Sequence, residues 1–76
     1  MFIETKKAVE RELKCLEKLG VPKHSIRMIE CQIARAVDKR ELGKTLKTAE
    51  GREKAYNRAL NEIGFASNLC HFARHC

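Results

Sequence analysis

The apolar residues of this chain recur at intervals of three and four, and this spacing constrains the fold more than any other feature. It is the period of an amphipathic helix, whose apolar stripe faces a core while charged residues occupy the other side. The first stripe predicts a helix over residues 2–19 and consists of Phe2, Val9, Leu13 and Leu16. Gly20 follows it and can adopt the left-handed conformation that ends a helix.

Two further stripes predict two more helices. The second covers residues 25–42, opens at Ser25 or the Pro22 turn, and is closed by Gly43. Its apolar face is formed by Ile26, Ile29, Ile33 and Val37. The third covers residues 48–63, with Thr48 as the expected N-cap. Its face is formed by Ala55, Tyr56, Ala59, Leu60 and Ile63.

The last segment, residues 65–75, carries an apolar face rotated by roughly a quarter turn from that of the third helix. This face contains Phe65, Ala66, Leu69, Phe72 and Ala73. One straight helix would bury both faces poorly, so the sequence predicts a break or kink at Gly64 and a short fourth helix. The expected fold is therefore all-α, a compact three- or four-helix bundle with short connections, in a single domain over residues 1–76.

With 76 residues, the chain has room for only a thin core. The residues expected to form it are Leu13, Leu16, Ile26, Ile29, Ile33, Tyr56, Leu60 and Ile63. A single core in a domain of this size rarely supplies more than about 3–5 kcal/mol, and many such domains are stabilised by a partner subunit. Association with a second copy or with another protein is therefore expected.

Sixteen basic against ten acidic residues give a net charge of +6, which favours anionic partners and leaves nucleic acid open as one. The two signs interleave along the chain, as they do on an ordinary solvated surface. The most basic stretch, from Arg35 to Lys47, is a candidate phosphate-facing patch. No apolar run has the length of a signal peptide or a membrane span, so we expect a cytoplasmic protein without a membrane partner.

The segment around Gly20 resembles the turn of a helix-turn-helix motif. In that motif one apolar residue directly follows the glycine, and a second lies six positions after the glycine. Val21 and Ile26 occupy these two positions here. A DNA-binding regulator would then read DNA through Lys23, His24, Arg27, Met28 and Gln32. Leu16 stands where the motif usually has a small residue. The alternative is an ordinary hairpin of two antiparallel helices joined by a Gly-Val-Pro turn.

The cysteines and histidines near the C-terminus raise the question of a zinc site or a thiol nucleophile. The four residues concerned are Cys70, His71, His75 and Cys76. On one helix they cannot converge on a tetrahedral centre, and neighbours such as Cys70 and His71 diverge by 100°. We therefore expect free thiols, no metal, no cofactor, no small-molecule substrate and no enzymatic activity.

The C-terminal segment is the strongest candidate for an interface. Its apolar residues cover close to half of the helix circumference, more than a small bundle is expected to bury. The expected contact residues are Phe65, Leu69, Phe72 and Ala73. The competing arrangement docks this face within the chain. The sequence thus favours a small helical regulator that binds itself or another protein, and so short a gene suggests a phage or another mobile element as its source.

Overall fold

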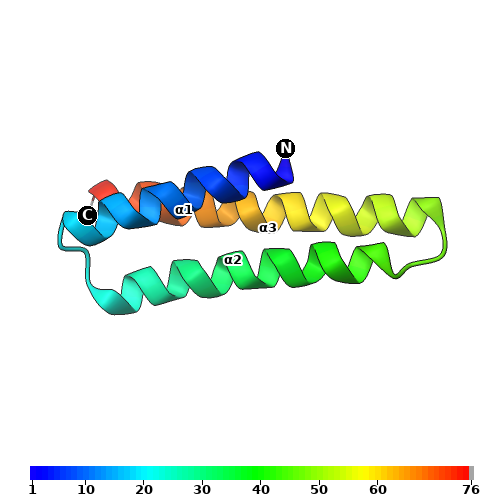
Figure 1. Cartoon of the computed structure of the whole chain (residues 1–76), viewed down its shortest axis with the longest axis horizontal. Helices are drawn as coiled ribbons and strands as arrows, with labels where there is room; N and C mark the ends of the chain where they lie inside the picture. Colours follow the sequence, from blue (N-terminus) through cyan, green and yellow to red (C-terminus); the bar gives the residue numbers. More distant parts are fainter. Residues whose placement is uncertain (76) are drawn as a thin grey trace.

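The computed structural model describes residues 1–75, which form three α-helices and no strand. Helix α1 spans Phe2–Lys18, α2 spans Lys23–Lys44 and α3 spans Ala49–His75. The helices run alternately up and down, so that α2 and α3 form a long antiparallel hairpin and α1 lies along one half of it (Figure 1). The molecule is a rod with extents of 45 × 19 × 16 Å. The all-α prediction is confirmed, with three helices.

The turn between α1 and α2 follows from Gly20 and Pro22. Gly20 adopts a φ of +83°, and the amide of Val21 donates a hydrogen bond of 3.1 Å to the carbonyl of Leu16. This left-handed glycine reverses the chain and satisfies a free carbonyl in the last turn of α1. Pro22 then precedes α2 with a φ of −55°. We call this end of the rod, together with the C-terminal part of α3, the turn end.

The connection between α2 and α3 forms the opposite end, which we call the loop end. The hydroxyl of Thr48 accepts a hydrogen bond of 3.0 Å from the amide of Gly51, as an N-cap residue does. Thr48 therefore caps α3 as predicted. None of the helices in the described part of the chain is long and apolar enough to cross a membrane.

The core runs along the seam between the three helices and contains six of the eight residues predicted for it. Its members are Phe2, Val9, Leu13, Leu16, Ile26, Ile29, Ile33, Ala36, Ala59, Ile63, Ala66 and Cys70. Two predictions need correction, because Tyr56 is 38% exposed and Leu60 is only partly buried. Helix α1 begins at Phe2 and leaves the loop end of the hairpin uncovered (Figure 1), so no third helix covers Tyr56.

The predicted break at Gly64 is wrong, because α3 continues through it as one helix. The buried residues of α3 lie in one stripe with spacings of four, three and four: Ala59, Ile63, Ala66 and Cys70. This stripe passes smoothly on both sides of Gly64. The large side chains of Phe65 and Phe72 suggested a rotated face, but the buried stripe consists of Ile63 and three small residues.

Helices α2 and α3 pack closely at the loop end. At Gly43, which is buried, a Cβ atom would lie 2.8 Å from the Cβ of Ala55. Real Cβ atoms do not approach this closely, so only glycine fits there without a shift of one helix. At the loop end, therefore, only two helices pack together, and their backbones lie close to each other at Gly43 and Ala55.

Candidate functional site

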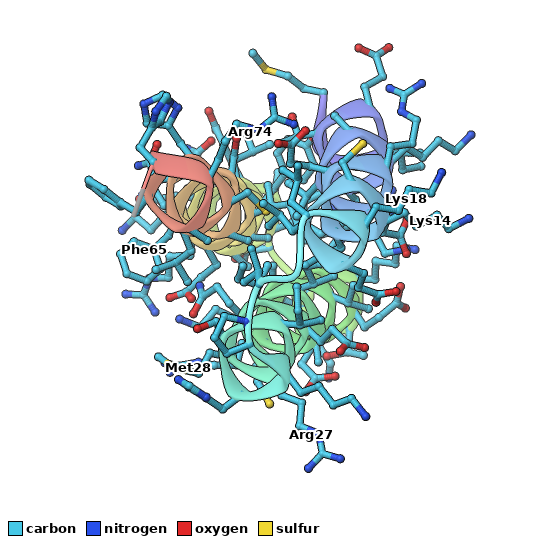
Figure 2. The ribbon with its side chains drawn as sticks, turned by 90° about the vertical axis from the view of Figure 1, so that its left-hand side faces the viewer. Lys14, Lys18, Arg27, Met28, Phe65 and Arg74 are labelled. Atoms are coloured by element: carbon cyan, nitrogen blue, oxygen red, sulfur yellow. The ribbon has the colours of Figure 1, made fainter. Side chains whose placement is uncertain are left out.

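Large apolar side chains gather on the turn end of the rod. Leu19, Met28, Phe65 and Phe72 are 66%, 62%, 53% and 63% exposed, respectively. Viewed along the rod, Met28 and Phe65 project to the same side, away from α1 (Figure 2). We call these four residues, with the partly buried Leu69 and Ala73 beneath them, the turn-end face. Apolar surface of this kind on a soluble protein typically marks a contact site.

A groove of about 510 Å³ lies within this face. It is open to solvent, and its walls come from the α1–α2 turn, the start of α2 and the end of α3. The lining residues are Leu19, Gly20, Val21, Pro22, Ser25, Met28, Ile29, Leu69, Phe72 and Ala73. Because these side chains are almost all apolar, the groove offers contact area to another apolar surface.

The predicted interface residues divide into two pairs. Phe65 and Phe72 are exposed, whereas Leu69 and Ala73 are partly buried and pack against the core. Part of the segment is therefore docked within the chain, and part faces solvent. Leu19 and Met28 were not predicted as members of this face. Only the packing of the α1–α2 turn against α3 brings them beside Phe72.

The exposed side of α3 carries a second regular stripe. It consists of Asn61, Phe65, Asn68, Phe72 and His75, with spacings of four, three, four and three, and all five are exposed. This is the spacing of a coiled-coil seam, in which apolar residues and an occasional Asn face a partner helix. The stripe carries no carboxylate, lysine or arginine. It runs beside the groove because Phe72 belongs to both.

The residues proposed for DNA reading do not share one surface. Lys23, His24, Arg27 and Met28 are exposed, but Gln32 is buried. Its amide donates a hydrogen bond of 3.0 Å to the backbone carbonyl of Glu62 and a second one to the carboxylate of Glu62. Gln32 therefore cannot reach a base edge, and its prediction is corrected.

The helices on either side of Gly20 also lack the arrangement of a helix-turn-helix. In that motif they meet at about 90–120°. Here α1 and α2 run antiparallel along the rod (Figure 1), which is the hairpin alternative. The resemblance in sequence reflects the shared demand for a glycine and an apolar residue in a tight turn.

A polar network ties α2 to α3 midway along the rod. Nζ of Lys39 lies 2.7 Å from Oε1 of Glu62, whereas the amide of Gln32 donates to Oε2 of the same carboxylate. These hydrogen bonds, from Lys39 and then from Gln32, hold the pKa of the Glu62 carboxyl below its ordinary value. The network fixes the register of the hairpin.

The C-terminal cysteines and histidines do not form a metal cluster within residues 1–75. Cys70 is buried in the core, and this burial raises the pKa of its thiol. His71 and His75 lie on the outside of α3 with ring centroids 4.5 Å apart. Cys76, the fourth member of the predicted set, lies outside the described residues.

The loop end carries a second groove, of about 220 Å³, that is basic rather than apolar. Its lining consists of Arg40, Gly43, Lys44, Arg52 and Tyr56. Arg40 and Lys44 belong to the basic stretch that the sequence indicated, while Arg52 and Tyr56 come from α3. The helix pattern alone did not bring the two sets together, because they meet only when α3 folds back along α2.

Comparison with protein-family models, with curated proteins and with solved structures gives no match to this chain.

Proposed function

We propose that this chain is a non-enzymatic helical interaction protein that acts as a homodimer, formed through the turn-end face and the exposed stripe of α3. The observation that carries the proposal is the exposure of four large apolar side chains on the turn-end face, three of which line its groove: Leu19, Met28 and Phe72. Desolvated aromatic side chains such as Phe65 and Phe72 are the residues that most often anchor interfaces. A second copy supplies the same apolar surface in return, as a two-fold interface requires.

Charge favours a second copy as the occupant. Residues 59–75 contain one acidic residue, Glu62, and one arginine, Arg74. Both already pair within the chain, Glu62 with Lys39 and Arg74 with Glu12. Two copies can therefore meet along this segment without setting unpaired like charges against each other, although each chain carries a net charge of +6.

The spacing of the stripe also selects an orientation. In an antiparallel pair centred on Asn68, Phe65 of each copy faces Phe72 of the other, and Asn61 faces His75. Arg58, one heptad before Phe65, then faces none of the residues up to His75 of the opposing α3. A parallel pair would instead place the two copies of Arg58 and of Lys54 against each other. The antiparallel pair matches apolar with apolar residues and keeps the basic residues apart.

Sedimentation equilibrium on the parent and on the double variant Phe65→Glu, Phe72→Glu tests the proposal. The parent should be a dimer. The variant should be a folded monomer with self-association weakened at least about 100-fold, because burying unpaired carboxylates costs several kcal/mol and each 1.4 kcal/mol is tenfold. The matched control is Leu42→Glu, Leu46→Glu, which places the same charges on exposed apolar residues of the loop end and should leave the dimer intact.

Cysteine cross-linking tests the orientation, in a background with Cys15→Ser, Cys31→Ser and Cys76→Ser. Asn68→Cys should form a disulfide with its own copy. Asn61→Cys should not, but it should cross-link to a chain carrying His75→Cys. A monomeric parent would overturn the dimer, and efficient cross-linking of Asn61→Cys to itself would overturn the antiparallel pair.

A further inference from the structure

The loop end has an unusual inward face. Helix α1 begins at Phe2, whose ring lies beneath the guanidinium of Arg40 at 5.1 Å from the ring centroid. Beyond that point α2 and α3 continue as a bare hairpin (Figure 1). The side of the hairpin that packs against α1 at the turn end is therefore open to solvent at the loop end.

On this open side, cations take the positions that the core pattern would fill with apolar residues. Arg40 lies one heptad after Ile33, and Lys44 lies one heptad after Val37. On α3, Arg52 lies one heptad before the buried Ala59. Residues seven apart share a helix face, so all three cations lie on the side where the core would continue.

These cations converge on one groove instead of spreading into solvent. Arg40, Lys44 and Arg52 all line the 220 Å³ groove, which contains no carboxylate in its lining. Arg40 is held by its contact with Phe2, and Arg52 by a hydrogen bond of 3.0 Å from its guanidinium to the carbonyl of Leu46. Lys44 makes only a 3.3 Å ion pair with Glu41, and both of these side chains are more than half exposed.

The wider region reinforces this local charge. Residues 35–58 contain eight basic and four acidic side chains, which account for +4 of the net charge of +6. Three like charges that share a groove repel one another, and an anion in the groove would relieve that repulsion. Solubility alone requires only a surface on which basic and acidic residues alternate. Helix α1 has such a surface, with five basic and four acidic residues.

We propose that this groove binds the phosphodiester backbone of single-stranded nucleic acid. Guanidinium groups match phosphate oxygens in geometry as well as in charge. Tyr56, 38% exposed in the groove lining, supplies a ring on which a base can stack, the second element of single-strand sites. An acidic helix of a protein partner would need an apolar anchor, and this lining offers no aliphatic side chain.

Fluorescence anisotropy with a labelled oligonucleotide of twelve thymidines tests the site. Lys44→Gln, Arg52→Gln should weaken binding at least tenfold. It should also reduce the slope of log K against log salt by about 1.4, because each neutralised phosphate of a single strand contributes about 0.7. Tyr56→Leu should weaken binding about tenfold without changing the slope, since stacking on an aromatic ring does not depend on salt.

Two control variants remove the same charge elsewhere. Lys14→Gln, Lys18→Gln lies on α1, and Lys23→Gln, Arg27→Gln lies at the turn end. In both controls the slope of log K against log salt should differ from that of the parent by less than about half of the change seen in Lys44→Gln, Arg52→Gln. Arg52→Gln also removes a hydrogen bond to the carbonyl of Leu46 and could loosen the α2–α3 connection. Lys44→Gln alone removes only the exposed ion pair with Glu41, so it tests the groove without that effect.

Equal loss in all three double variants would show diffuse charge and overturn the site. Loss confined to Lys23→Gln, Arg27→Gln, with tighter binding of a duplex than of the single strand, would place nucleic acid at the turn end and also overturn it. An acidic peptide that displaces the oligonucleotide and binds more tightly would point to a protein partner instead. Phe65→Glu, Phe72→Glu should retain oligonucleotide binding, so failure of the dimer leaves this test intact.

Discussion

The two ends of the rod solve the same packing problem in different ways. At the turn end three helices meet, and side chains as large as Leu16 and Ile63 are fully buried between them. At the loop end only α2 and α3 remain, and they approach closely at Gly43 and Ala55. The turn end exposes a group of large apolar side chains, whereas residues 35–58, which include the loop end, carry +4 of the net charge. Coverage by α1 therefore decides where this short chain can build a core.

The largest expected effect separates the two ends directly. Leu16→Ala should lower the free energy of unfolding by about 2–5 kcal/mol, because it leaves a cavity in a three-helix layer. Leu16 is 0% exposed, whereas Tyr56 is 38% exposed. Tyr56→Ala should therefore cost about 1 kcal/mol or less. Urea unfolding followed by circular dichroism measures both, and equal losses would mean that the ends do not differ in packing.

Substitution of two glycines sharpens the comparison. The expected changes in stability are smaller than that of Leu16→Ala, and they have opposite signs at the two positions. Gly43→Ala should destabilise the protein by about 1–2 kcal/mol, because the added Cβ meets Ala55 and forces the helices apart. Gly64 has no such neighbour within 4 Å. Gly64→Ala should therefore stabilise by about 0.5–1 kcal/mol, the gain in helix propensity. Thermal melting compares them, and a loss of stability in Gly64→Ala would argue for the kink that the continuous α3 excludes.

The smallest effect concerns the network between the ends. The pKa of Glu62 is lowered in the folded chain, so its contribution to stability is present above the pKa of an unfolded glutamate. That contribution is lost as the pH falls through the lower, folded value. Glu62→Gln should reduce stability at neutral pH by less than about 1 kcal/mol and flatten the dependence of stability on pH in the acidic range. An unchanged acid profile would show that this network contributes nothing.

Much of the fold could be read from the order of residues. Apolar spacing located the faces of the first two helices and placed Ala59 and Ile63 on that of the third. Gly20, Pro22 and Thr48 marked the turns, because these signals act within a few residues of one another. The same spacing placed Leu13, Leu16, Ile26, Ile29, Ile33 and Ile63 in the core. Local patterns such as these are fixed by backbone geometry, whatever the helix later packs against.

The remaining features of the core depended on how the helices pack against one another. Residue size suggested a face through Phe65 and Phe72, but the packed structure buries the small residues Ala59 and Ala66 instead. Tyr56 lost its place in the core because α1 begins at Phe2 and does not extend over the loop end. Gln32, which has the pattern of a surface residue, became buried because Glu62 lies opposite to accept its hydrogen bonds.

Both candidate sites also depend on how the helices pack against one another. The turn-end groove joins residues from the α1–α2 turn to the end of α3, and the basic groove joins α2 to the start of α3. The sequence determined the helices, the turns and the excess of positive charge, because each of these is a property of neighbouring residues or of composition. Only the tertiary structure decided which apolar and which basic side chains share a surface, because that depends on contacts between residues far apart in the chain.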